Sequence, residues 1–142
     1  MEPFHKFLDH TADVFFVAKA ETLPQLFEQC ALAVEETMVD VEMVHRKTKI
    51  KILGEDKNIG NLLYDFLDDL VFFKDYQQLV FSKFEITIDE HDGKYSLVCW
   101  ASGEKIDHTR HDPKVDIKAI TRHMFEVFKQ DNAWKAQVLV DI

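Results

Sequence analysis

The sequence is poor in residues that break regular structure, because it has four glycines and three prolines among 142 residues. It has twelve phenylalanines, and hydrophobic residues make up 46% of the chain. Disordered chains have low hydrophobicity and abundant Pro and Gly, so this composition excludes a disordered chain and predicts a packed core. The length predicts a single domain, residues 1–142, that buries most of its surface.

Cysteine is also scarce, with Cys30 and Cys99 as the two examples. They are far apart in apolar sequence and form no CxxC pair, which favours buried, reduced thiols over a disulfide. No apolar run approaches the roughly 18 residues of a membrane-spanning helix, and the residues after Met1 do not form a signal peptide. We therefore expect a cytoplasmic protein that has no membrane partner.

Basic residues are outnumbered, with 17 Lys and Arg against 26 Asp and Glu, and the formal net charge is −9. Phosphate binding draws its affinity from clusters of Lys and Arg, and no such cluster is visible along the chain. The composition therefore predicts no strong direct binding to nucleic acid. The acidity favours a basic protein partner or a metal ion, or it serves solubility alone.

Motifs of catalysis are missing as well. The chain contains no GxSxG, GxxxxGK[ST] or GxGxxG segment, so acyl transfer and nucleotide binding have no signature. No bound nucleotide is expected, and a protein without enzymatic activity is the leading interpretation.

Hydrophobic periodicity indicates two helices, one from Thr22 to about Val39 and one from Ile59 through Val71. Thr22 has the character of an N-cap, with Gln25 at the matching position of a capping box. Alternating residues predict strands at 48–53, 79–88 and 95–100, with a hairpin turn at 91–94. Residues 103–113 are polar and are predicted to form a loop.

The segment 115–128 fits both helical and strand spacing. Its β-branched and aromatic residues, followed by a turn at 130–132, favour a strand that pairs with residues 134–141. The order of the elements predicts an α+β fold, a two-layer sandwich in which two helices pack on one face of a mainly antiparallel sheet.

Acidic residues stand at both ends of the chain. Asp9 and Asp13 flank a short polar turn between apolar runs, and Asp141 and Ile142 close the last predicted strand. If the terminal strands are neighbours, these carboxylates and the Ile142 main chain converge and need a cation, for which Ca²⁺ or Mg²⁺ is better suited than Zn²⁺. The alternative is that Asp9 and Asp13 cap backbone N–H groups in the turn, which leaves Asp141 unexplained.

Histidines offer a second possible site. His108 and His111 stand beside Asp107 and Asp112. Together with His10, they have the residue types of a zinc or general-base site in a metal-dependent hydrolase. No HExxH motif accompanies them, and scattered histidines are more often surface or core groups.

Several short segments, in this order and at this chain length, together resemble the archease family. The most specific are the DHTADV sequence that starts at Asp9, the KAIT sequence that starts at Lys118, and the final Asp-Ile. The matching segments are Phe7–Val14, Thr22–Leu23, Phe73–Asp75, Leu79–Phe81, Gly103–Glu104, Ile117–Thr121 and Asp141–Ile142.

The resemblance implies a small non-catalytic protein that promotes guanylylation and multiple turnover of a GTP-dependent RNA ligase of the RtcB type, in tRNA splicing and RNA repair. It also implies a divalent-metal site formed by Asp13, Asp141 and the main chain of Ile142. Further residues are implied as contacts for ligase activation. These are Lys118, Asp9, His10 and Glu104.

Two other functions stay open at this point. A chaperone-like role beside a tRNA methyltransferase has also been associated with the family, and it predicts protection of unrelated client proteins. A hydrolase predicts turnover by the isolated protein.

Overall fold

The structure is a computed structural model, and it describes residues 1–10 and 12–142. Within these residues the chain forms two α-helices, a short 3-10 helix and eight strands. The helices are α1 (Leu23–Met38), η1 (Val41–Met43) and α2 (Ile59–Gln77). The strands are β1 (Phe4–Leu8), β2 (Val14–Ala20), β3 (Thr48–Asp56), β4 (Leu79–His91), β5 (Lys94–Lys105), β6 (Ala119–Ile120), β7 (Glu126–Gln130) and β8 (Ala133–Asp141).

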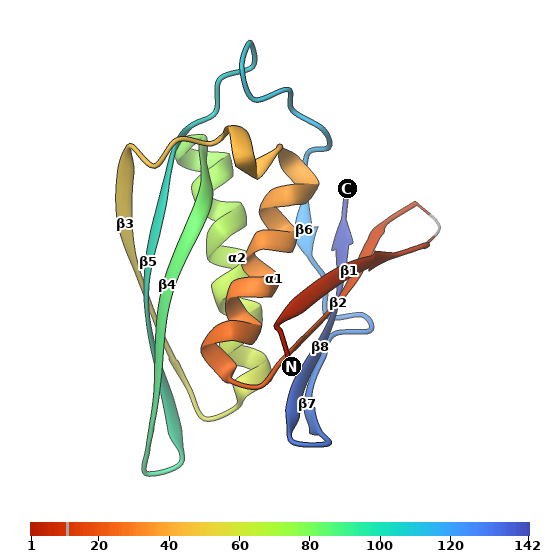
Figure 1. The fold of residues 1–142 in the computed structure, drawn as a ribbon, viewed down its shortest axis with the longest axis vertical. Helices are drawn as coiled ribbons and strands as arrows, with labels where there is room; N and C mark the ends of the chain where they lie inside the picture. Colours follow the sequence, from red (N-terminus) through yellow and green to blue (C-terminus); the bar gives the residue numbers. More distant parts are fainter. Residues whose placement is uncertain (11) are drawn as a thin grey trace.

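The strands form two antiparallel sheets on either side of the helix pair (Figure 1). One sheet has the order β3-β5-β4, and the other has the order β1-β2-β8-β6 with β7 also paired to β8. The predicted α+β sandwich is confirmed. The prediction of one sheet covered by helices on one face is corrected, because the helices lie between two sheets.

Helix α1 explains this difference, because it is buried on more than one side. It packs against β2 of one sheet and β4 of the other. Phe27 and Cys30 are fully buried, and so are Ala31 and Ala33, which point about 200° apart around the helix. Small residues allow close approach, so the helix can be covered by both sheets.

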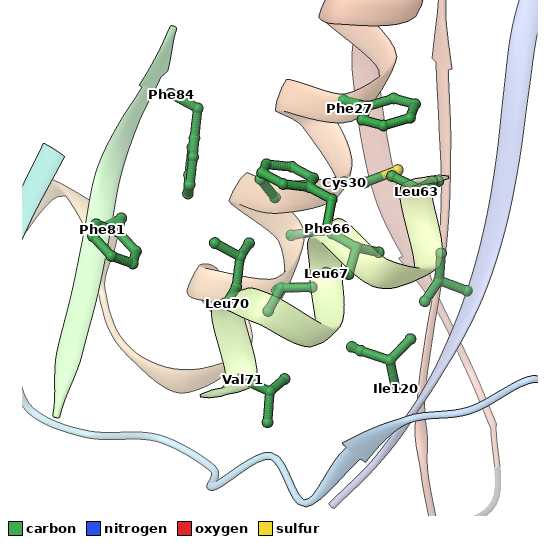
Figure 2. Close-up of a cluster of buried hydrophobic side chains, with 14 of the residues drawn as sticks. Phe27, Cys30, Leu63, Phe66, Leu67, Leu70, Val71, Phe81, Phe84 and Ile120 are labelled. Carbon is green, nitrogen blue, oxygen red and sulfur yellow. The ribbon is translucent and has the colours of Figure 1, made fainter. Parts of the chain in front are cut away.

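Aromatic and aliphatic side chains of both helices fill the space between the sheets (Figure 2). Phe66 of α2 stacks on Phe27 of α1, with 5.9 Å between ring centroids, and meets Phe84 of β4 edge-on at 6.3 Å. Cys30 and Cys99 are both free and buried, as the sequence predicts. The described helices include none that is long and apolar enough to cross a membrane.

The local predictions hold best where turn and cap residues are decisive. Thr22 accepts a hydrogen bond from the backbone N–H of Gln25 at 3.3 Å and so caps α1. The β4–β5 hairpin turns at Asp92 and Gly93, which have positive φ angles of 51° and 73°. The polar loop begins later than predicted, because β5 continues through Gly103 and Glu104 to Lys105.

The segment 115–128 is extended, and the helical alternative is wrong. The predicted continuous strand is nevertheless divided into the two-residue β6 and the longer β7. Met124, with a φ of 60°, lies in the intervening turn. The predicted closing hairpin is confirmed, because β7 pairs with β8 around Asp131 and Asn132.

Gly103 marks a close approach of β5 to β4. A Cβ atom there would lie less than 3.0 Å from backbone atoms of Val80 and Phe81. Because backbone atoms cannot rotate away, we expect Gly103→Ala to lower the free energy of unfolding by about 3 kcal/mol, measured by urea denaturation. Gly54→Ala is the control, since its Cβ would meet the movable Leu62 side chain at 3.1 Å. Equal losses in the two variants would contradict the backbone clash.

Candidate functional site

The second and last strands bring the two predicted acidic residues together. Val14, the first residue of β2, pairs with Val140 of β8, so Asp13, which precedes β2, and Asp141, the last residue of β8, lie at the same end of the sheet. Val140 is fully buried toward the helices, and side chains alternate along a strand. Asp141, the next residue of β8, therefore has its carboxylate on the face away from the helices.

Lys118 reaches the same place from a different part of the chain. Its backbone N–H donates to the carbonyl oxygen of Asp141 at 2.8 Å, and the next residue, Ala119, is the partner of Asp141 in β6. The Lys118 side chain is exposed. Three distant segments therefore bring Asp13, Lys118 and Asp141 to one end of the sheet, with Ile142 directly after Asp141. We call this end of the sheet the acidic edge.

The β1–β2 connection carries the other predicted residues of this region. His10 has Nδ1 3.9 Å from Oδ2 of Asp13, and its ring lies 6.0 Å from the ring of Phe15. Asp9 is exposed. Thr11, within the sequence signature, lies outside the described residues. His10 is thus placed beside Asp13, the residue that the resemblance implies in metal binding.

The oxygen ligands available at the acidic edge indicate which metal ion could bind there. Among residues 1–10 and 12–142, no three His, Cys, Asp or Glu side chains gather as a metal site built from side chains would require. Asp13 and Asp141 offer two carboxylates, and main-chain oxygens and water would complete the shell. Ca²⁺ and Mg²⁺ accept such oxygen ligands, whereas Zn²⁺ prefers His and Cys. The residues fit Ca²⁺ or Mg²⁺, and the metal site stays a prediction.

The alternative histidine site is not formed. His111 is fully buried; its Nδ1 accepts from the backbone N–H of Asp107 at 2.7 Å, and its Nε2 lies 2.9 Å from Glu104 Oε2. Both ring nitrogens are therefore engaged within the protein. His10, His108 and His111 do not appear as a metal-binding group among the described residues, so the alternative zinc site is wrong.

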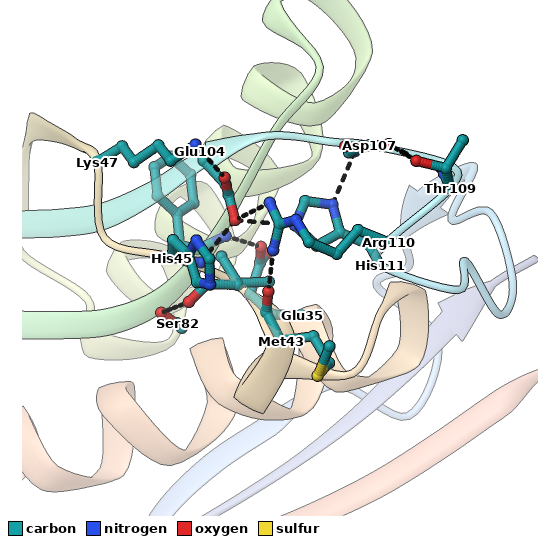
Figure 3. A network of polar contacts seen from close by, with 12 residues as sticks. Glu35, Met43, His45, Lys47, Ser82, Glu104, Asp107, Thr109, Arg110 and His111 are labelled. Atoms are coloured by element: carbon teal, nitrogen blue, oxygen red, sulfur yellow. Dashed lines mark hydrogen bonds and ion pairs between the residues drawn. The ribbon is translucent and has the colours of Figure 1, made fainter.

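Glu104 lies inside a polar network at the end of β5 (Figure 3). Its side chain is 6% exposed, and Oε2 lies 2.6 Å from both the Arg110 guanidinium and the His45 backbone nitrogen. Burial raises the pKa of Glu104, but the hydrogen bonds from Arg110, His45 and His111 outweigh burial and hold the pKa below its usual range. The carboxylate is thus ionised and enclosed, which suits holding a loop better than contacting a partner.

The loop between β5 and β6, residues 106–118, is tied down along its length. Arg110 donates to the carbonyl oxygen of Met43 at 2.6 Å, and the Lys114 N–H donates to that of Met38 at 2.8 Å. Near the far end, Lys74 of α2 donates to the carbonyl oxygen of Ile117 at 2.6 Å. This loop ends at Lys118, so the Glu104 network and the acidic edge are joined by one fixed segment.

Sequence reasoning missed these anchors. Arg110 and Lys74 carry no motif, and their partners lie up to 67 positions away in the chain. The available signal was the concentration of Asp and His near residues 107–111, which led to a metal site instead of a buried ion pair.

Comparison with known proteins identifies the fold and the family. The family model for the Archease protein family matches residues 5–142. Protein archease of Pyrococcus furiosus is 39% identical over 135 residues, covering 94% of this chain and 95% of the relative. Protein archease of Methanosarcina mazei is 38% identical over 139 residues, covering 97% and 95%.

Solved structures agree. The solution structure of protein 1598 of Methanobacterium thermoautotrophicum has a TM-score of 0.87 and 36% identity, over 97% of this chain and 98% of that chain. The crystal structure of a Thermotoga maritima archease, called a possible chaperone, has a TM-score of 0.63 at 16% identity, over 96% of each chain, and supports the fold alone. Since the family match and its relatives span nearly the whole sequence, the chain belongs to the archease family.

Proposed function

We propose that this protein is a non-catalytic activator of a GTP-dependent RNA ligase of the RtcB type, and that it promotes ligase guanylylation and multiple turnover in tRNA splicing and RNA repair. One observation carries the proposal: strand pairing brings Asp13, Lys118 and Asp141 to the same end of the sheet. The family resemblance implicates these residues, and they come from three distant segments. Membership of the archease family supports the same function.

Asp13, Lys118 and Asp141 offer charges to the ligase, so the effect that we propose is a bias between ligase conformations. An activator that binds the GTP-reactive state of the ligase more tightly than the unreactive state shifts the population toward the reactive one. A tenfold shift needs about 1.4 kcal/mol of differential binding. A lysine and two carboxylates at an interface can supply that amount, because close charge pairs couple by about 1.5 kcal/mol or more.

A divalent cation at this edge would be held by Asp13, Asp141 and the main chain of Ile142. When bound, it supplies positive charge that offsets the repulsion between two carboxylates at the same end of the sheet. We expect Ca²⁺ or Mg²⁺ at a hundred times its dissociation constant to stabilise the fold by about 2.7 kcal/mol, seen as a rise in Tm. Asp141→Asn should remove this rise in Tm. Asp65→Asn is the control, because Asp65 is an exposed residue of α2, and it should keep the rise. No rise in the wild-type protein at saturating metal would contradict an ion site in the isolated chain.

The ligase experiment is multiple-turnover RNA joining by a cognate RtcB-type ligase with GTP and divalent metal, with RNA in excess. We expect more than one joined product per ligase when this protein is present, and at least a tenfold lower rate with Asp13→Asn, Asp141→Asn or Lys118→Gln. Asp65→Asn and Lys57→Gln are matched charge controls that keep full activation. If the wild-type protein changes neither guanylylation nor turnover, the proposal is wrong.

A chaperone-like role, including one beside a tRNA methyltransferase, is the second candidate. Phe72 and Tyr76 of α2 favour it, because these two rings, 4.6 Å apart between centroids, are 49% and 76% exposed and offer an apolar contact for client proteins. That role predicts suppressed aggregation of unrelated clients and loss of suppression in Phe72→Ser. A ligase activator shows no such protection.

A further inference from the structure

A groove crosses the outer face of the five-stranded sheet, away from the acidic edge. Its volume is about 340 Å³, and the side chains that matter are Phe4, Lys6, Lys19, Phe128 and Lys135. No Asp or Glu is among its lining residues in the described part of the chain. A cationic and aromatic groove is unexpected on a protein with a formal net charge of −9.

Strand register arranges four of these side chains in a row. Phe4 of β1 is opposite Lys19 of β2, Lys19 is opposite Lys135 of β8, and Lys135 is opposite Phe128 of β7. Opposed residues share a face, so the row has a ring at each end and two ammonium groups between them. Three strand spacings give a span of about 14 Å. The four strands lie side by side in Figure 1.

The two central lysines are unfavourable for stability. Like charges directly opposite each other on antiparallel strands repel. Among the described residues, the ion pairs include neither of these lysines nor Lys6. Lys135 donates to the neutral side chain of Gln130 at 2.6 Å, which leaves its charge uncompensated. An anion seated between Lys19 and Lys135 would relieve this repulsion.

The two exposed phenylalanine rings indicate which class of anionic ligand fits the groove. Phe4 is 41% exposed and Phe128 is 39% exposed, although aromatic rings are usually buried. An acidic peptide would satisfy the lysines through its carboxylates but would leave both rings uncovered. A nucleic acid strand supplies both parts, because its phosphates meet basic side chains and its bases stack on aromatic rings.

We infer that this groove binds single-stranded nucleic acid, with phosphate on Lys19 and Lys135 and bases on Phe4 and Phe128. The site uses none of the residues of the acidic edge and goes beyond ligase activation. Three lysines give a salt dependence with a slope of about −2, so affinity falls roughly 20-fold between 50 mM and 200 mM salt. Such weak, salt-sensitive binding is compatible with the acidic composition.

The test is fluorescence polarisation of the full chain with a labelled, unpaired ten-nucleotide RNA at 50 mM and 200 mM salt. We expect Lys19→Gln/Lys135→Gln to weaken binding at least tenfold, and Phe128→Leu, which removes the ring but keeps an apolar side chain, at least fivefold. Lys57→Gln/Lys94→Gln loses the same charge outside the groove, before α2 and at the start of β5, and is expected to change binding less than twofold. The groove lysine variant should not melt at a lower temperature than wild type, since it removes a repulsion.

Three results would overturn the inference. They are no binding at 50 mM salt, binding that both groove variants leave unchanged, and polyglutamate binding as tightly as RNA without sensitivity to Phe128→Leu. The last result would identify an acidic-peptide site. Because no ligase is present in the assay, failure here leaves the ligase proposal standing, and the reverse also holds.

Discussion

Glu104→Gln is expected to lower the free energy of unfolding by about 4 kcal/mol, because removing one partner of a buried ion pair typically costs 3–5 kcal/mol. Oε2 of Glu104 lies 2.6 Å from the Arg110 guanidinium and 2.9 Å from Nε2 of buried His111. Glutamine keeps the size of the side chain but leaves the arginine without a counter-charge. Urea denaturation at pH 7 measures the loss.

Glu85→Gln is the matched control. Glu85 also pairs with two cations, Lys49 at 3.1 Å and Lys83 at 3.2 Å, but its side chain is 43% exposed. Exposed pairs contribute little to stability, because solvent screens them. If Glu104→Gln costs no more than Glu85→Gln, the buried network does not hold the 106–118 loop.

The same network has an acid dependence with a definite sign. The folded pKa of Glu104 lies below its ordinary value of 4.5, so its contribution to stability is present above pH 4.5 and is lost as the pH falls below it. Wild type should therefore lose more stability than Glu104→Gln on acidification from pH 5 to pH 3.

The elements that sequence reasoning located are those with a local cause. The Thr22 cap, the periodicity of α2 and the Asp92–Gly93 turn each lie within a few residues of the structure they determine. The division into two sheets has no such local cause. Alternation shows that one face of a strand is buried, and it does not show which sheet the strand joins; the fully buried Ala31 and Ala33 of α1 were the sign that the helix is covered on several sides.

The two candidate sites also differ in whether the sequence alone could locate them. The acidic edge was predicted, because Asp13 and Asp141 flank the strands that meet and the family signature includes both. The groove was not predicted. Lys6, Lys19 and Lys135 are far apart in the sequence, and only the register of β1, β2 and β8 brings them together. The absence of a Lys/Arg cluster along the chain therefore did not exclude a cluster on the folded surface.

We expect the largest effect of pH to come from Glu35, which should lower the free energy of unfolding as the pH rises from 5 to 9. Its side chain is fully buried on α1; Oε1 accepts from the Phe81 N–H at 2.7 Å, and Oε2 has no hydrogen-bond partner among the described residues. Burial raises the pKa of Glu35 to about 8, against smaller opposing effects of the Phe81 N–H and Lys74.

Between the unfolded value of 4.5 and the folded value of about 8, the folded protein keeps a proton that the unfolded chain releases. Stability from this group is therefore complete below pH 4.5 and is lost as the pH rises through 8, by on the order of 4 kcal/mol. Glu35→Gln has no charge to bury and is expected to remove most of this slope, so that the variant becomes more stable than wild type at pH 9. Urea denaturation across the pH range measures both slopes.

His5 must be separated from this effect, because it acts in the same direction. A hydrogen bond to Glu36 raises the pKa of His5 above 6.5, so its contribution to stability is present below pH 6.5 and is lost as the pH rises through the folded value. His5→Gln removes that component and leaves the Glu35 component, which extends to about pH 8. If Glu35→Gln and wild type share one slope and His5→Gln flattens it, the β1–α1 contact is the pH-dependent element and the buried carboxyl is not.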